Sequence, residues 1–130
     1  MIVLDASAAS DWLLQTPAGR RIEDRLYSQS ESLHAPHLVD IEVTQVLRRL
    51  VRERTLVANR ADDAIRDFLD LWITRYPHFA LLPRIWELRH SLSVYDAAYV
   101  ALAELLEVPL LTRDKKMASA AGHYAVVEVI

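Results

Sequence analysis

The chain has 130 residues, of which 52% are hydrophobic, and a formal net charge of −3 at pH 7. This length fits one domain over residues 1–130, with a core large enough to need neither metal nor disulfide for stability. There is no cysteine, which excludes disulfides, thiolate metal sites and a cysteine nucleophile. The first residues lack the pattern of a secretory leader and no apolar run has membrane-spanning length, so we expect a soluble, cytoplasmic protein.

The predicted elements alternate between strands and helices along the chain. The β-branched run IVL predicts a strand that ends at Asp5, and a helix over 6–14 follows, stopped by Pro17 and Gly19. The further predictions are helices over 20–28, 38–53, 59–76 (or 61–76), 84–92, 93–107 and 115–121, and strands over 33–36, 79–83, 108–112 and 124–129. Such alternation predicts an α/β fold with a mainly parallel central sheet flanked by helices on both faces.

Four acidic residues stand where the predicted elements meet their loops. Asp5 and Asp114 follow two strands, and in an open parallel sheet the carboxyl ends of the strands line the edge where ligands bind. Asp96 opens a helix. Glu42 lies on or beside the apolar stripe of helix 38–53, where an unpaired carboxylate is unfavourable. We therefore expect the four carboxylates to converge at one edge of the sheet.

Each acid also has an ordinary explanation when it is considered alone. Asp5 and Asp114 can be helix N-caps, Asp96 completes the capping-box pattern SVYD, and Glu42 can pair with an arginine of a neighbouring helix. Taken together, four unpaired carboxylates would repel one another and raise at least one pKa. A bound divalent cation would remove that repulsion.

The ligand types available favour a hard cation. Without cysteine or a helical histidine pair, oxygen ligands favour Mg²⁺ or Mn²⁺ over zinc. Sites of this type hydrolyse phosphodiesters with a metal-activated water, so no protein nucleophile is needed. Ser7 and Thr112 are candidates to orient a carboxylate or that water, although helix capping and strand propensity also explain them. Tyr95 and Tyr99 lie close to Asp96 and are weaker candidates for the same cleft.

Charge distribution leaves the nature of the partner open. A net negative charge argues against nucleic acid, because phosphate contacts supply most of that affinity. The segment RRLVRERTLVANR (48–60), however, holds five arginines against one acid. It can steer a polyanion, form a solvated helix face or dock an acidic protein. Arg113 and Lys115, beside Asp114, are candidates to contact phosphate, and the three tryptophans are expected in the core or at a dimer interface.

With these motifs in hand, the sequence resembles the PIN-domain ribonucleases, and specifically the VapC-type toxins of bacterial and archaeal toxin–antitoxin pairs. The resemblance runs nearly end to end through IVLDASA, HLVDIEVTQVLRRL, SVYDAAYVALAE and PLLTRDKKMA. It implies that the family's catalytic and metal-binding acidic quartet falls on Asp5, Glu42, Asp96 and Asp114. Ser7 and Thr112 are the supporting hydroxyls.

The resemblance implies several properties of the protein. They are Mg²⁺- or Mn²⁺-dependent endonucleolytic cleavage of RNA, homodimerisation, and inhibition by a cognate antitoxin whose tail occupies the cleft. Two other functions stay open on the sequence alone. One is a phosphotransferase with Asp5 as nucleophile, although Ser7 stands where such enzymes carry a second acid. The other is a non-catalytic domain that binds RNA or a protein, with the acids serving as caps.

Overall fold

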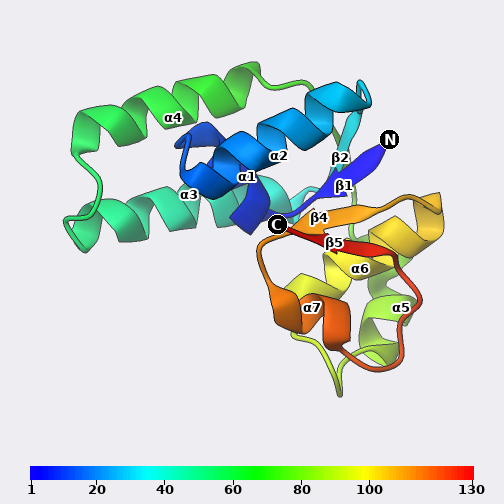
Figure 1. Ribbon diagram of the computed structural model, residues 1–130. Coiled ribbons are helices and arrows are strands. Elements are labelled where there is room, and N and C mark those ends of the chain that lie inside the picture. Colours follow the sequence, from blue (N-terminus) through cyan, green and yellow to red (C-terminus); the bar gives the residue numbers. More distant parts are fainter.

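The centre of the fold is a five-stranded parallel sheet (Figure 1). The computed structural model describes residues 1–130, and its strands run in the order β3-β2-β1-β4-β5, all in parallel register. The predicted mainly parallel sheet is therefore confirmed. The strands are β1 (Ile2–Leu4), β2 (Leu33–Pro36), β3 (Ile73–Tyr76), β4 (Leu110–Thr112) and β5 (Val127–Val129).

Seven helices cover the sheet. Figure 1 shows α1 to α4 on one side and α5 to α7 on the other, with α3 and α4 forming a long hairpin that extends beyond the strands. Helix α6 is buried along most of its length and packs against β1, β2 and β4. None of the helices has the length and apolar character required to cross a bilayer. The helices are α1 (Ala6–Leu13), α2 (Pro17–Ser28), α3 (Leu38–Arg52), α4 (Ala58–Asp70), α5 (Leu82–Glu87), α6 (Val94–Leu106) and α7 (Lys115–Ser119).

Two predictions in the middle of the chain are wrong. The helix expected to reach Tyr76 ends at Asp70, and Ile73–Tyr76 forms the edge strand β3, because pairing with β2 outweighs the helical periodicity. The strand expected over 79–83 is instead a 3₁₀ turn (Phe79–Leu81) followed by α5. Pro83 lies in the first turn of α5, where its missing N–H has no helical partner to lose.

The boundary between α1 and α2 also differs from the prediction. Pro17 is the first residue of α2 rather than a stop, and Gly19 lies inside that helix. The side chain of Thr16 caps α2 by accepting a hydrogen bond from the N–H of Gly19 at 2.9 Å. A Cβ at position 19 would stand 1.9 Å from the carbonyl oxygen of Asp11. Glycine is therefore required here by the close approach of α2 to α1.

Replacing Gly19 with alanine is expected to lower the free energy of unfolding by roughly 3 kcal/mol, because the added methyl group forces α2 away from α1. Gly122→Ala is the control. Gly122 has φ +90, and its Cβ would make only an ordinary van der Waals contact, 4.0 Å from Leu88 Cδ2, so backbone strain of about 1 kcal/mol is the only cost expected. Urea unfolding measures both variants. Gly19→Ala as stable as the wild type would contradict this packing.

Candidate active site

A cleft of about 600 Å³ opens at the carboxyl ends of β1 and β4. Helices α1, α3 and the start of α6 form its walls. Parallel strands present their carboxyl ends at one edge, and this is the edge at which the sequence places the acids. The structure brings all four predicted acids into the lining of this single cleft: Asp5, Glu42, Asp96 and Asp114.

Asp5 is the buried member of the set, with 4% of its surface exposed. It is the N-cap of α1, and its Oδ1 accepts hydrogen bonds from the N–H of Ala8 at 2.9 Å and from the hydroxyl of Ser7 at 2.7 Å. Its Oδ2 accepts from the hydroxyl of Thr112. Asp5 thus both caps α1 and lines the cleft, and hydrogen bonds fix the direction of both of its carboxylate oxygens.

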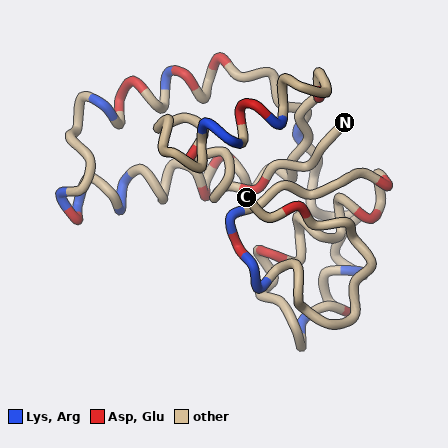
Figure 2. Tube along the Cα trace, in the orientation of Figure 1, with Lys and Arg blue, Asp and Glu red and all other residues tan.

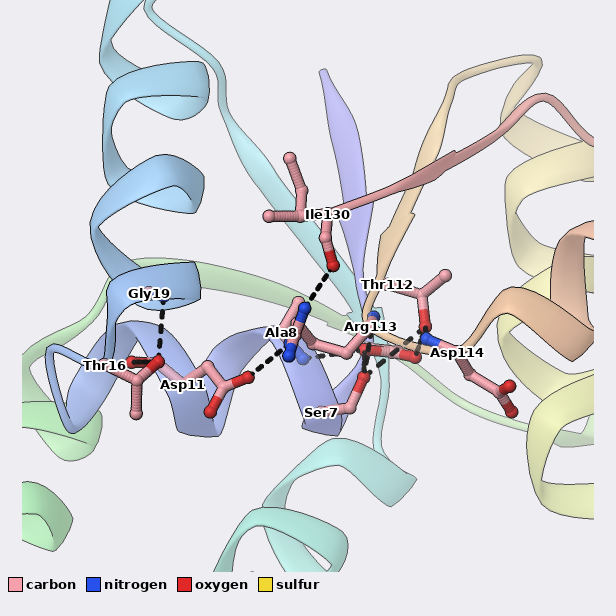
Figure 3. A network of polar contacts seen from close by, with 10 residues as sticks. Ser7, Ala8, Asp11, Thr16, Gly19, Thr112, Arg113, Asp114 and Ile130 are labelled. Carbon is pink, nitrogen blue, oxygen red and sulfur yellow. Dashed lines mark hydrogen bonds and ion pairs between the residues drawn. The ribbon is translucent and has the colours of Figure 1, made fainter.

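The two predicted hydroxyls join α1 to the loop after β4 (Figure 3). The oxygens of Ser7 and Thr112 lie 3.4 Å apart. Ser7 Oγ accepts the N–H of Arg113, and Thr112 Oγ1 accepts the N–H of Asp114, each at 3.0 Å. Asp114 in turn caps α7 by accepting the N–H of Lys116 at 2.9 Å. The hydroxyls therefore link the positions of Asp5 and Asp114.

Arg113 is engaged within the protein. Its Nε donates to Asp11 Oδ2 at 2.7 Å, and its Nη1 donates to the carbonyl of Ile130 (Figure 3). These contacts tie α1 to the segment after β5 and favour a positioning role over phosphate contact. Asp11 also lines the cleft and was not singled out from the sequence. Its place four residues after Ser7, on the same helix face, is the signal that could have found it.

Glu42 is held from the opposite wall. Its Oε1 accepts the hydroxyl of Tyr99 at 2.6 Å, and Tyr99, on α6, is 1% exposed. Tyr95 also lines the cleft. Both tyrosines that the sequence offers as weaker candidates for the cleft therefore line it, and Tyr99, three residues after Asp96, shares the helix face of that acid. The predicted capping of α6 is also present, with the N–H of Asp96 donating to Ser93 Oγ at 3.1 Å.

The carboxylates lie close enough to influence each other's ionisation. Burial raises the pKa of Asp5 to about 6, and the charge of Asp96 adds to that rise. Burial also raises the pKa of Glu42, again with a contribution from Asp96. The pKa of Asp96 is raised by burial and then by Asp114. The repulsion expected from the sequence is thus present, with Asp96 coupled to the other three.

The donor set fits a hard divalent cation in its chemistry. All four side chains offer carboxylate oxygens, which hard divalent cations prefer. Burial raises the pKa of Asp5, Glu42 and Asp96, and neighbouring carboxylates add to each rise, so a bound cation would relieve unfavourable negative charge. No three histidine, aspartate or glutamate side chains are grouped tightly enough to form a finished binding cluster. Mg²⁺ does not require one, because it usually keeps several waters and takes one or two carboxylates together with substrate phosphates.

Replacing Asp5 with asparagine keeps a capping side chain and removes the buried charge. The pKa of Asp5 is about 6 in the folded protein, against an ordinary value of 3.8, so the folded state binds this proton more tightly than the unfolded state does. The stability that comes from this proton is therefore fully present below about pH 4 and is lost as pH rises through 6. The free energy of unfolding of the metal-free variant should therefore exceed that of the wild type by roughly 3 kcal/mol near pH 7.5, and this advantage should vanish near pH 4. Urea unfolding at both pH values measures this.

The control for that experiment is Asp67→Asn, an exposed site on α4 outside the cleft. Its stability relative to the wild type should not follow this pH dependence. If the advantage of Asp5→Asn stayed constant with pH, the buried charge would not be its cause.

Comparison with known sequences agrees with this geometry. Residues 2–123 match the sequence model of the PIN domain. The chain is 41% identical over 130 residues to ribonuclease VapC12 of Mycobacterium tuberculosis H37Rv, covering 100% of this chain and 99% of that protein. It is 45% identical over 117 residues to ribonuclease VapC9 of the same strain, covering 90% and 88% of the two chains.

Solved structures show the same fold at low sequence identity. One is M. tuberculosis VapC20, described as a sarcin-ricin loop cleaving toxin, with a TM-score of 0.68, 19% identity, and coverage of 97% of this chain and 98% of that one. Another is VapBC2 from Rickettsia felis, bound to a DNA fragment from its promoter, with a TM-score of 0.70, 14% identity, and coverage of 99% and 98%. Through its sequence relatives and its PIN domain, the chain belongs to the VapC ribonuclease toxins.

Proposed function

We propose that the protein is a divalent-metal-dependent endoribonuclease, the toxin of a type II toxin–antitoxin pair. The observation that carries the proposal is the convergence of four carboxylates in one cleft, with Asp5 fixed by three hydrogen bonds. In this proposal Asp5, Glu42, Asp96 and Asp114 are the metal ligands and catalytic residues. The metal is Mg²⁺ or Mn²⁺, since the ligands are hard oxygens.

A divalent cation, when bound, lowers the pKa of the attacking water and stabilises the leaving oxygen. Side chains of the protein hold the carboxylates that would bind this cation. Ser7 and Thr112 hold both oxygens of Asp5 in fixed directions, and Tyr99 holds Glu42. This preorganisation avoids reorientation of the charged groups during the reaction. Asp5, with its pKa of about 6, is in its charged form under neutral conditions without a cation and more fully so with one.

The same contacts count against Asp5 as a covalent nucleophile. Its Oδ1 accepts two hydrogen bonds and its Oδ2 one, so neither oxygen is free to approach a phosphorus atom without losing partners. Such bonds also stabilise the charged form and make it a weaker nucleophile. A ligand role needs only the lone pair that remains on Oδ2, and the carboxylate stays where these bonds hold it. The contacts therefore favour metal binding over phosphoryl transfer to Asp5.

The proposal includes two protein partners, a cognate antitoxin and a second copy of the chain. Supporting it, large apolar side chains stand on the surface, which is typical of protein interfaces. Trp72 is 92% exposed and follows α4, while Trp86 and Phe79 are exposed around α5. Of the three tryptophans, only Trp12 packs against the core. The core alternative predicted for the tryptophans thus holds for Trp12 alone, and the exposure of Trp72 and Trp86 supports the interface alternative for those two.

Cleavage of a cellular RNA pool by purified, antitoxin-free protein tests the function. We expect discrete fragments with Mg²⁺ or Mn²⁺ and none with EDTA. Asp96→Asn should lower the cleavage rate by more than about 100-fold. Even mutation of a residue that only hydrogen-bonds to a metal ligand typically lowers metal affinity or activity by about 10- to 100-fold. Asp67→Asn, on the exposed face of α4, is the matched control and should cleave like the wild type.

Each opposite result has a definite meaning. Cleavage that persists in EDTA, or that Asp96→Asn leaves unchanged, would contradict the metal-dependent mechanism. A folded wild type that cuts no RNA with either metal would contradict the nuclease and favour the non-catalytic binding domain. Circular dichroism and urea unfolding of each variant establish that it is folded.

A further inference from the structure

The cleft extends along α3 well beyond the acidic residues. Glu42, Gln45, Val46 and Arg49 recur at helical spacings of three and four and all line it. Seven residues separate Glu42 from Arg49, or about 10 Å along the helix axis. One wall of the cleft therefore carries a carboxylate at its sheet end and a guanidinium two turns away.

Arg49 is the only arginine that lines this cleft. Figure 2 shows basic residues along the far part of the α3–α4 hairpin, where the arginine-rich segment lies. Arg48 and Arg52 border a separate groove between α3 and α4, and Arg60 donates to the carbonyl of Leu13 at 2.7 Å. The structure thus separates arginines that the sequence presents as one run.

Arg49 has only a weak partner within the protein. Its Nε lies 3.8 Å from Glu53 Oε1, and both side chains are more than half exposed. An exposed ion pair at this distance contributes little to the stability of the protein, and salt screens it further. The guanidinium is therefore available to an anionic ligand that enters the cleft.

The opposite wall, on α1, carries a second and independent signal. Ser10 lines the cleft and is 4% exposed. Its Oγ is the only buried side-chain nitrogen or oxygen without a hydrogen-bond partner in the protein. Leaving a buried hydroxyl unpaired is unfavourable, and such groups are rare in folded proteins. Ser10 also follows Ser7 by three residues, so it continues the face of α1 that carries the Asp5 network.

We propose that Arg49, with Ser10 and Gln45, forms a backbone subsite that holds an RNA phosphate beyond the one that is cleaved. The inference rests on the proposed ribonuclease function and adds residues outside the acidic quartet. A guanidinium binds phosphate through paired hydrogen bonds, while the hydroxyl and the amide can bond to phosphate or to a ribose 2′-OH. Contacts to the phosphate backbone hold the strand without reading its bases, so this subsite adds affinity for the RNA strand equally before and during cleavage.

The electrostatics of the cleft favour such a contact. Four carboxylates line the cleft and repel a polyanion, whereas the charge of Asp11, which also lines it, is paired with Arg113. A metal held by the four acids would offset part of this charge at the sheet end of the cleft. Arg49 supplies positive charge at the other end of the same wall, where a neighbouring phosphate of the strand would lie.

The test measures binding separately from cleavage. A fluorescent single-stranded RNA oligonucleotide is titrated with Asp96→Asn protein in Mg²⁺ at several salt concentrations, with and without Arg49→Ala. We expect Arg49→Ala to weaken binding about tenfold, as for loss of one charged hydrogen-bonded contact. The slope of log affinity against log salt should shrink by about 0.7. Arg49→Lys should recover part of the loss, because it restores charge but not the paired geometry.

Arg48→Ala is the matched control, one residue away and facing the other groove. It should bind RNA within about twofold of the parent, since a solvated arginine outside the cleft makes no phosphate contact in this scheme. Cleavage by the otherwise wild-type protein should show a raised KM for Arg49→Ala and a nearly unchanged kcat. A contact that binds the substrate and the transition state equally well has this effect when it is lost, because only KM then changes.

Ser10→Ala separates ligand binding from structure. Removing an unpaired buried hydroxyl should leave the protein as stable or more stable, while RNA binding weakens. Equal RNA affinities for Arg49→Ala and Arg48→Ala would overturn the subsite while leaving wild-type cleavage, and hence the nuclease proposal, intact. Arg49→Ala that keeps its RNA affinity but loses affinity for the cognate antitoxin would also overturn it, and would assign Arg49 to an acidic protein partner.

Discussion

A carboxylate buried between two neighbouring strands needs hydrogen-bond donors, and Asp5 receives them from three directions. The N–H of Ala8 and the hydroxyls of Ser7 and Thr112 surround it, and Thr112 comes from a strand distant in sequence. Even so, burial raises its pKa to about 6. The geometry that holds Asp5 thus leaves a charge only partly compensated, and the rest of the cleft is arranged around that charge.

The topology explains how distant segments contribute to one site. Strands β1 and β4 are adjacent and parallel, so the residues that follow them emerge side by side, and each begins a helix. The capping explanation and the functional explanation of Asp5 and Asp114 are therefore not alternatives, because the N-caps of α1 and α7 lie where ligands bind. Helix α6 completes the arrangement by placing Asp96 and Tyr99 opposite α3.

The sequence predicts site residues whose position follows from local secondary structure. It does not predict pairings that arise only when distant segments pack together. The strand ends located Asp5 and Asp114, and the periodicity of α3 located Glu42. Strand β3 was missed because its pairing with β2 is not visible in a helical pattern that continues to Tyr76. The partner of Glu42 was missed because Tyr99 lies 57 residues away. Arg49 lines the acidic cleft and Arg48 lines the groove between α3 and α4, and this difference depends on how α3 packs against its neighbours.

The cleft holds negative charge that a bound cation would offset, and the release of protons on metal binding is the measurement that tests this. Mn²⁺ would be titrated calorimetrically into metal-free protein near pH 6, in two buffers with different heats of ionisation. Because Asp5 is partly protonated at this pH, Mn²⁺ binding should expel protons, and the Asp96→Asn variant should bind Mn²⁺ far more weakly. Absence of binding, or binding without proton release, would contradict it.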